Sequence, residues 1–256
     1  MRYGLIGEKL GHSYSKLIHE KIADYTYDLI PLSEEEFKDF MSKKDFKAIN
    51  VTIPYKQDVI PYLDSLDPLA KEIGAVNTIV NNDGRYIGYN TDFFGFQYML
   101  EHNAIQIEGM KCLILGSGGT SLTAMAVLKH MGASEVLVVS RRSTPGTISY
   151  EECYDKHNDA QIIVNTTPLG MYPNIDATPI DLLPFEGCEA VVDAIFNPLE
   201  TKLTLQAKQL GMKGVTGLEM LVAQAKQAIE YFLGTKLEDQ VIEDTYQYLI
   251  GIVQNK

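Results

Sequence analysis

A glycine-rich turn in the middle of the chain has the residue types and spacing that bind a dinucleotide pyrophosphate. In Leu113-Ile114-Leu115-Gly116-Ser117-Gly118-Gly119-Thr120-Ser121, an apolar strand is expected to end at the first glycine, and a helix to follow. Gly116 permits the tight turn, Gly118 lets the backbone approach a pyrophosphate, and the helix N-terminus offers free N–H groups to the anion. Ser121 replaces the third glycine of the usual GxGxxG pattern and is small enough for close packing. The strand–turn–helix context favours cofactor binding over a purely structural turn.

The residues after the next predicted strand indicate which dinucleotide is bound. Val139-Ser140-Arg141-Arg142 lacks the acidic residue that NAD-binding proteins place there for the ribose hydroxyls. Arginines suit a 2′-phosphate by charge and by bidentate geometry. We therefore expect NADP, with one of the two arginines in contact with its phosphate. The alternative is that both arginines are solvated loop residues.

Polar residues gather at the ends of predicted elements in the N-terminal third. Residues 11–16, Gly-His-Ser-Tyr-Ser-Lys, place two hydroxyls before a predicted helix, where either is also typical of an N-cap. Residues 50–56 end a predicted strand, at the edge where ligands bind in open α/β sheets. Residues 74–78 and 88–92 add amides, hydroxyls and a carboxylate. Each run has an ordinary explanation alone, such as a surface lysine or a helix cap, but together they are too polar for a simple core.

The elements expected to position these residues alternate between strands and helices. Strands are predicted at 2–6, 48–53, 76–80, 86–89, 111–115, 135–139, 162–164, 190–193 and 213–215. Helices are predicted over 17–25, after the capping box of Ser33 and Glu36, after Asp67-Pro68, from Asp92, and over 124–131, 203–210 and 218–252 with a break at Gly234-Thr235. The turn signal Asn81-Asn82-Asp83-Gly84 predicts a hairpin. This alternation predicts a mostly parallel, doubly wound α/β fold.

Composition limits the class of protein and of partner. The 256 residues, 45% of them hydrophobic, suit one large α/β domain or two smaller ones. The net charge of -12 argues against nonspecific binding to nucleic acid or anionic membranes, without excluding an anionic ligand at a local site. Three cysteines without CxxC spacing are typical of free thiols in a reducing compartment, and no signal peptide or membrane span is seen. We expect a cytoplasmic protein, either a monomer or a homodimer, that binds a small molecule.

No metal site is predicted. His12 and His19 could share a helix face, but no acid or cysteine joins them at the spacing of metal ligands. Surface or capping roles are the better interpretation of these histidines.

The ordered set of motifs is similar to that of the shikimate dehydrogenase family. The motifs are GHSYS, NVTIPYK, GAVNT, GYNTD, GSGGTS, NTTPLGM, DAIFNPLET and GLEMLVAQA, within residues 4 to about 226. The resemblance implies an NADP-dependent oxidoreductase that interconverts 3-dehydroshikimate and shikimate in chorismate and aromatic amino acid biosynthesis. It also implies two domains, an N-terminal α/β substrate domain over 1–102 with 226–256 and a Rossmann-like NADP domain over 103–225. The active site is expected in the cleft between them.

The resemblance further implies roles for individual residues. Lys56 and Asp92 would be the catalytic pair, with Lys56 donating a proton to the ketone oxygen and Asp92 orienting the ammonium group and the substrate hydroxyl. Substrate-binding residues would be Ser13 and Ser15 at the carboxylate, and Thr52, Asn77 and Gln224 at the other oxygens. Cofactor-binding residues would be Gly116, Gly118, Gly119 and Thr120 at the pyrophosphate, Ser140, Arg141 and Arg142 at the adenosine phosphate, and Thr166, Pro168, Gly170, Met171 and Gly217 further along the cofactor.

The sequence departs from the family pattern at three places. Ser140 stands where the family usually has Asn, and Phe196 where it often has Tyr, which removes a hydroxyl from the substrate side. The stretch from Arg142 to Asn165 is shorter than usual, so a crossover helix is expected to be trimmed or absent. Two alternatives stay open, a relative that prefers quinate or NAD and a ligand-binding paralogue without turnover. Such a paralogue is expected to lose Lys56 or Asp92, and both are present.

Overall fold

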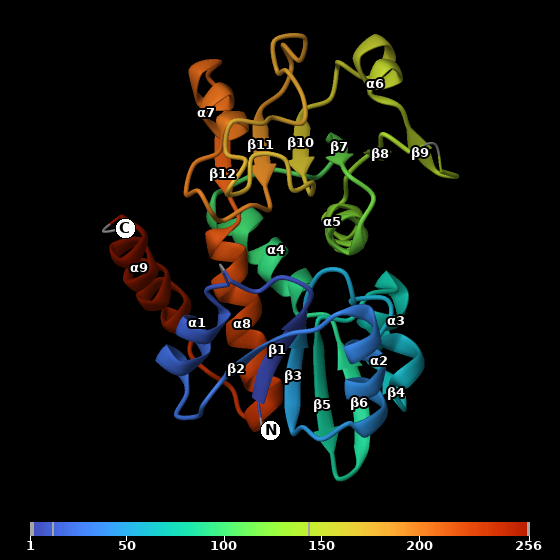
Figure 1. Cartoon of the computed structure of the whole chain (residues 1–256). Coiled ribbons are helices and arrows are strands. Elements are labelled where there is room, and N and C mark those ends of the chain that lie inside the picture. The colour runs from blue at the N-terminus through green and yellow to red at the C-terminus, as the bar shows by residue number, and fades with distance from the viewer. Residues whose placement is uncertain (1–2, 12, 143, 255–256) are drawn as a thin grey trace. The chain divides into compact units, whose positions relative to one another are not determined.

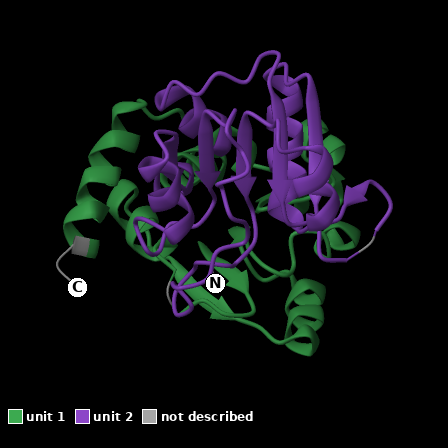
Figure 2. Ribbon diagram, turned by 90° about the horizontal axis from the view of Figure 1, so that it is seen from above, with its two compact units in different colours: residues 1–95, 222–256 green, residues 96–221 purple. Residues whose placement is uncertain are grey.

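The computed structural model describes residues 3–11, 13–142 and 144–254, and its elements are labelled in Figure 1. The chain forms two compact units, shown in separate colours in Figure 2. The first comprises residues 1–95 and 222–256, and the second comprises residues 96–221. Each unit is built on a six-stranded sheet, so the predicted α/β class is confirmed.

The sheet of the first unit is mixed, with strand order β2-β1-β3-β5-β6-β4. Its strands are β1 (Tyr3–Gly7), β2 (Asp28–Pro31), β3 (Ala48–Val51), β4 (Ser65–Leu66), β5 (Thr78–Asn82) and β6 (Arg85–Tyr89). β1 is parallel to β2 and β3, whereas β5 is antiparallel to both β3 and β6. The predicted hairpin is confirmed as β5–β6, with its turn at Asp83 and Gly84, whose φ angles of 51° and 89° suit an Asp-Gly turn.

Register brings the polar runs of the first unit to one edge of this sheet. Asn50 near the end of β3 is paired with Thr78 at the start of β5, and Thr78 is paired with Tyr89 at the end of β6. The residues after β3, before β5 and after β6 therefore emerge side by side, although they are distant in sequence.

Local capping signals set the beginnings of several helices in the first unit. Its helices are α1 (Ser15–Ile22), α2 (Glu34–Lys43), η1 (Ile60–Tyr62), α3 (Pro68–Ile73) and α9 (Gln240–Gln254), with parts of α4 (Asp92–His102) and α8 (Leu218–Leu233). The predicted capping box is confirmed, since Ser33 Oγ accepts from Glu36 N and Glu36 Oε2 accepts from Ser33 N. The prediction that the first helix reaches Tyr25 was wrong. It ends at Ile22 because Ala23 is extended, and the Tyr25 ring instead stacks on Tyr3 at 4.2 Å between centroids.

The sheet of the second unit is entirely parallel, with strand order β12-β11-β10-β7-β8-β9. Its strands are β7 (Lys111–Leu115), β8 (Glu135–Val139), β9 (Thr147–Ile148), β10 (Ile162–Asn165), β11 (Ala190–Asp193) and β12 (Lys213–Thr216). Counted within the unit, this is the 3-2-1-4-5-6 order of the dinucleotide-binding fold, whose ligands bind where the order reverses, here between β7 and β10.

The helices of the second unit include α5 (Gly119–His130), α6 (Tyr150–Lys156) and α7 (Lys202–Gln209). The short stretch between Arg142 and Asn165 keeps a crossover helix, α6, but it is only 7 residues long. Central strands β10 and β11 are buried along their whole length, as expected for a parallel sheet covered on both faces. The cysteines are buried free thiols, as predicted. Within the described residues, no helix is both long and apolar enough to cross a membrane.

Candidate active site

Lys56 and Asp92 form a buried ion pair in the first unit. Lys56 Nζ donates to Asp92 Oδ2 at 2.6 Å, and their side chains are 11% and 8% exposed. Lys56 lies in the turn after β3, and Asp92 is the first residue of α4. The side chain that caps α4 belongs to Asn90, whose Oδ1 accepts from Phe93 N at 3.1 Å. The Asp92 carboxylate is therefore directed to the lysine instead of serving as the cap.

The amide of Asn77 lies at the centre of a buried polar group beside this pair. Asn77 Oδ1 accepts from Thr91 N at 2.7 Å, which ties Asn77 to the residue before Asp92. Asn77 Nδ2 donates to Thr91 Oγ1 at 2.9 Å and to Gln224 Oε1 at 3.3 Å. The structure thus brings together two residues that the family resemblance had paired with substrate oxygens. Thr91 was not predicted, although it stands in the GYNTD motif.

Ser13, Ser15 and Thr52 lie at the ends of other elements of the first unit. Ser15 is buried as the first residue of α1, and Tyr14 occupies the N-cap position. Ser13 Oγ accepts from Ser15 N at 3.2 Å, so Ser13 contributes part of a cap and Ser15 does not. Thr52 follows β3, and a Cβ at Gly7 would lie 2.5 Å from its methyl carbon. The absence of a side chain at Gly7 therefore makes space for the Thr52 side chain. His12 lies outside the described residues. His19 is fully buried and stacks on Tyr27, so the prediction of a surface or capping role for it was wrong.

The glycine turn of the second unit has the geometry that a pyrophosphate site requires. Gly116 has a φ of 104°, and a Cβ there would approach Thr166 Oγ1 to 2.9 Å. Gly118 is the N-cap of α5, no side chain caps the helix, and a Cβ on Gly118 would point into open space. Gly119 and Thr120 begin the helix. The first N–H groups of α5 are therefore accessible to an anion, and the residues present fit the phosphates of a dinucleotide.

Exposed arginines follow the second strand of this sheet. Arg141 and Arg142 are exposed, and in the described part of the chain neither is paired with a carboxylate. Ser140 Oγ accepts from Arg142 N at 3.1 Å and lies 3.3 Å from Ser117 Oγ. Ser140 thus links the arginine loop to the glycine turn, and the two guanidinium groups fit a phosphate on the adenosine side.

The remaining predicted cofactor residues lie in loops after β10 and β12. Thr166 Oγ1 donates to Leu115 O at 2.8 Å, which joins the ends of β10 and β7. Gly170 has a φ of 97°, and Met171 is 43% exposed beside it. Gly217 contacts the backbone of Ala194 so closely that no side chain would fit. Packing alone is enough to explain the glycine at 217.

The chain is similar over most of its length to known proteins of one family. A model of the shikimate dehydrogenase substrate-binding domain matches residues 5–79. The shikimate dehydrogenase (NADP(+)) of a Clostridium perfringens strain is 39% identical to this chain, covering 96% of it and 97% of the relative. The crystal structure of shikimate dehydrogenase 1 from Peptoclostridium difficile has a TM-score of 0.90 at 34% identity, covering 97% of both chains. The Thermus thermophilus shikimate 5-dehydrogenase, in complex with NADP(H) and shikimate, has a TM-score of 0.85 at 28% identity, covering 97% of this chain and 99% of that one.

The chain belongs to the shikimate dehydrogenase family. The resemblance inferred from the motifs is thereby confirmed. In the residues that the structure describes, no three His, Cys, Asp or Glu side chains form a group that could hold a metal ion.

A buried carboxylate, Asp193, lies at the end of β11 in the second unit. Its Oδ1 accepts from Asn165 Nδ2 and from Ile195 N, both at 3.0 Å, and its Oδ2 accepts from Thr201 Oγ1 at 2.8 Å. Asp193 thereby joins the end of β10, the loop after β11 and the start of α7. Burial raises the pKa of Asp193 from 3.8 to about 6, against the opposing effect of these hydrogen bonds.

Stability should fall with rising pH because of Asp193. Its pKa is higher in the folded protein than in the unfolded chain, so between about pH 4 and 6 the folded state binds more protons. We expect the loss to reach at most roughly 3 kcal/mol and to be complete above this window. Asp193→Asn, which keeps an acceptor and can donate to Thr201, should flatten this dependence when denaturant midpoints are compared across the window. The exposed Asp176→Asn is the control, and equal slopes in both variants would contradict the assignment.

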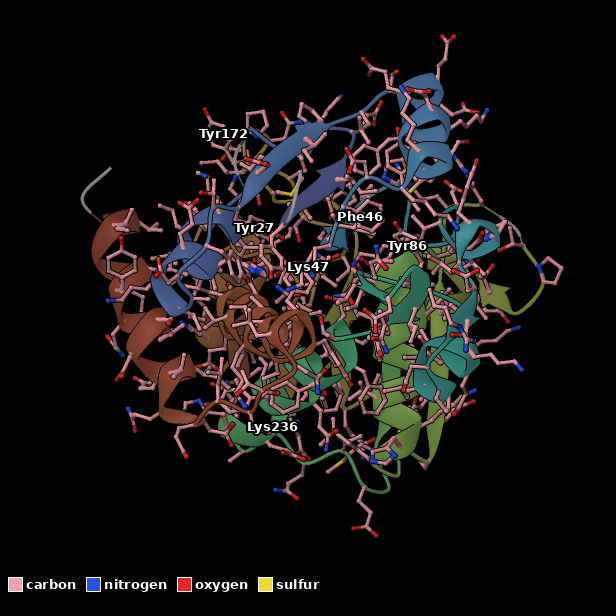
Figure 3. All side chains as sticks on the ribbon, turned by 90° about the horizontal axis from the view of Figure 1, so that it is seen from below. Tyr27, Phe46, Lys47, Tyr86, Tyr172 and Lys236 are labelled. Carbon is pink, nitrogen blue, oxygen red and sulfur yellow. The ribbon has the colours of Figure 1, made fainter. Side chains whose placement is uncertain are left out.

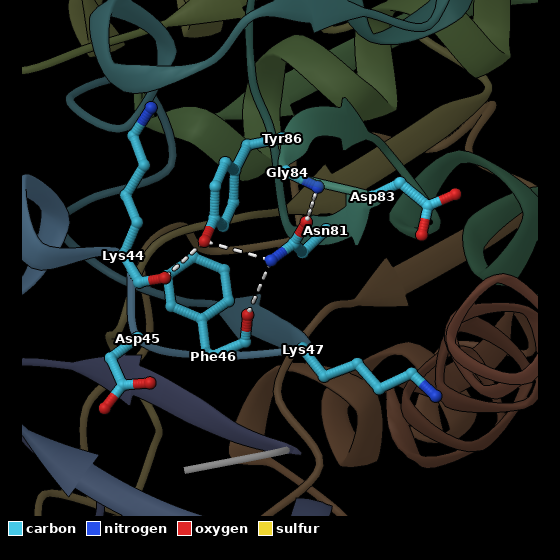
Figure 4. Close-up of a pocket in the computed structure, with 8 residues that line it drawn as sticks. All are labelled: Lys44, Asp45, Phe46, Lys47, Asn81, Asp83, Gly84 and Tyr86. Carbon is cyan, nitrogen blue, oxygen red and sulfur yellow. Dashed lines mark hydrogen bonds between the residues drawn. The ribbon is translucent and has the colours of Figure 1, made fainter.

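A shallow surface pocket lies at the other end of the first sheet from Asn77. It is lined by the residues before β3 and around the β5–β6 turn, namely Lys44, Asp45, Phe46, Lys47, Asn81, Asp83, Gly84 and Tyr86 (Figure 4). Tyr86 OH donates to Lys44 O, and Asn81 Oδ1 accepts from Gly84 N at 2.7 Å. None of the predicted site residues contributes to this pocket, and within it Asn81 holds the β5–β6 turn through its bond from Gly84 N.

Proposed function

We propose that this protein catalyses the NADPH-dependent reduction of 3-dehydroshikimate to shikimate and the reverse reaction. The observation that carries the proposal is the buried Lys56–Asp92 ion pair at 2.6 Å, beside the amides of Asn77 and Gln224. Family membership supports it, since the relatives include enzymes named shikimate dehydrogenase (NADP(+)). A non-catalytic paralogue is expected to lose one of these two residues, and both are present.

When bound, NADPH supplies the hydride, which goes to the ketone carbon of the substrate. The Lys56 ammonium donates its proton to the ketone oxygen as negative charge develops there, and it regains a proton from solvent afterwards. Asp92 holds the ammonium in place by the hydrogen bond to its Oδ2. In the direction of alcohol oxidation, the neutral Lys56 amine accepts the hydroxyl proton.

The proposed substrate-binding groups all belong to the first unit. Ser13 and Ser15 bind the carboxylate at the start of α1, where the helix N-terminus favours negative charge. Thr52, Asn77 and Gln224 bind the other oxygens. Asn77 Oδ1 accepts from Thr91 N, and Nδ2 donates to Thr91 Oγ1 and Gln224 Oε1, so a substrate hydroxyl would accept from Nδ2 in place of the longer contact to Gln224.

The proposed cofactor-binding groups all belong to the second unit. The turn of Gly116, Gly118, Gly119 and Thr120 binds the pyrophosphate, Ser140, Arg141 and Arg142 bind the adenosine phosphate, and Thr166, Met171 and Gly217 lie further along the cofactor. We also propose that the enzyme is cytoplasmic, as its buried free thiols suggest, and that it is a monomer or a homodimer without nucleic-acid partners.

Arg141→Ala should reduce the preference for NADP over NAD. A lost charge-assisted contact to a phosphate costs about 1.5–3 kcal/mol, so kcat/KM for NADP should fall about 10- to 150-fold. NAD lacks the phosphate, and its kcat/KM should stay within about twofold. The exposed Arg85→Ala in the β5–β6 hairpin is the matched control. An equal loss with both cofactors would contradict the phosphate contact.

A panel of two substrates and two cofactors tests the proposed specificity. Initial rates with shikimate or quinate, each with NADP or NAD, should give the highest kcat/KM for shikimate with NADP. A higher value with quinate or with NAD would assign the protein to a different activity within the family.

A further inference from the structure

A chain of buried hydrogen bonds begins at Tyr27, outside the proposed active site. Tyr27 OH donates to Asn50 Oδ1 at 2.7 Å. Asn50 Nδ2 in turn donates to Thr78 Oγ1 at 3.0 Å and to Asn77 O at 3.2 Å. Tyr27, labelled in Figure 3, is fully buried just before β2. Asn50 belongs to β3, Thr78 is the first residue of β5, and Asn77 precedes it. The hydrogen bonds therefore link the segment before β2 to β3, although β1 lies between these two strands in the sheet, and then link β3 to its neighbour β5.

The series of hydrogen bonds continues to Thr91, the residue that precedes Asp92. Thr78 Oγ1 donates to Asn77 Oδ1 at 3.1 Å, and the same Oδ1 accepts from Thr91 N at 2.7 Å. Thr91 is followed directly by Asp92, the partner of Lys56. Four consecutive bonds thus link the Tyr27 hydroxyl to the backbone N–H beside the proposed catalytic carboxylate.

The direction of donation along this series of hydrogen bonds is set by groups that can only donate or only accept. The backbone oxygen of Asn77 can only accept, so the Asn50 amide must turn its Nδ2 to that side and its Oδ1 to Tyr27. Thr78 Oγ1 then accepts a hydrogen bond from Asn50 Nδ2 and donates its own hydroxyl hydrogen to Asn77 Oδ1. Thr78 Oγ1 and Thr91 N both donate to Asn77 Oδ1, so the Asn77 amide is held with Nδ2 toward Thr91 Oγ1 and Gln224 Oε1.

We propose that Tyr27 and Asn50 are positioning residues of the active site, which act through Thr78 on the amide of Asn77 and the placement of Asp92. The proposal rests on the proposed function, because its readout is turnover of shikimate. Removing the Tyr27 hydroxyl leaves Asn50 Oδ1 buried without its donor, and a buried polar group without a partner favours rearrangement of its neighbours. The rearrangement would reach Asn77 first.

Tyr27→Phe with Tyr25→Phe as its matched control tests the proposal. Tyr25 OH lies 2.7 Å from His19 Nδ1, so Tyr25→Phe also removes one hydroxyl and one hydrogen bond to a buried side chain, but none in the chain to Asn77. We expect Tyr27→Phe to lower kcat/KM for shikimate about tenfold or more. The Kd for NADP, titrated without shikimate, should be unchanged in both variants. Tyr25→Phe should keep kcat/KM within about twofold, even if it lowers the melting temperature as much as Tyr27→Phe does.

Substitutions of Thr78 provide a second, independent arm. Thr78→Ser keeps the hydroxyl and should be close to wild type, whereas Thr78→Val has the same shape without it and should lose as much as Tyr27→Phe. The double variant Tyr27→Phe with Thr78→Val should be little worse than the worse single variant, since both interrupt one chain. Equal kinetics of Tyr27→Phe and Tyr25→Phe, or of Thr78→Val and Thr78→Ser, would overturn this inference and leave the proposed function standing. A wild type without shikimate turnover would overturn the proposed function, and the inference with it.

Discussion

Lys56→Met and Asp92→Asn should each lower kcat for shikimate oxidation by about 10²–10⁴-fold, the range of a lost general acid–base group. Lys56→Met removes the proton donor while keeping a chain of similar length. Asp92→Asn keeps the shape of the side chain but removes the charge that holds Lys56 Nζ at 2.6 Å. The Kd for NADP should change little, because neither residue belongs to the unit that carries the glycine turn.

The double variant distinguishes a working pair from two independent residues. Because Asp92 acts on the reaction through the lysine, Lys56→Met with Asp92→Asn should be little worse than the worse single variant. The measurement is kcat for all four proteins at saturating substrate. Near-normal kcat in either single variant would remove that residue from the mechanism, and fully additive losses would break the claim that the two act as one unit.

Replacing both Ser13 and Ser15 by Ala should raise KM for shikimate by at least about 100-fold, since each hydrogen bond to a charged group contributes about 1.5–3 kcal/mol. Only Ser13 Oγ bonds a backbone N–H of the helix start, so loss of capping should cost roughly 1 kcal/mol in total. Ser15→Ala alone should therefore raise KM with almost no change in melting temperature. Steady-state kinetics and thermal unfolding of the single and double variants provide both readouts.

The methyl ester of shikimate is the control for this prediction, because it lacks the carboxylate charge. The wild type should bind the ester much more weakly than shikimate, and the double variant should hardly distinguish the two. A large drop in melting temperature with normal KM would instead assign both serines to the stability of α1.

Local sequence signals predicted the parts of the fold that depend on neighbouring residues. The capping box at Ser33, the hairpin turn at Asp83-Gly84 and the glycine turn at Gly116 each act within a few residues, and each lies where it was predicted. Tyr25 shows the limit of periodicity. Its spacing from Ile18 and Ile22 fits one face of a helix, but the helix ends at Ile22. Tyr25 makes its apolar contact after the extended Ala23, by stacking on Tyr3.

The parts of the site that depend on register could not be derived from the residues alone. Gln224 reaches Asn77 across 147 positions, and Tyr27 reaches Asn50 across 23. Gln224 was named only through the family resemblance, and nothing local marked Tyr27, whose role depends on which strands become neighbours. The same holds for Asp92, since only the structure shows that Asn90 supplies the cap and leaves the carboxylate to Lys56.

The central claim is tested most directly by following NADPH formation when the purified protein is mixed with shikimate and NADP. The wild type should form NADPH and 3-dehydroshikimate in equal amounts, with catalytic turnover, and Lys56→Met should lose nearly all of this activity while it still binds NADP. A wild type that binds shikimate and NADP but forms no NADPH would contradict the claim, and the protein would then be a ligand-binding member of the family.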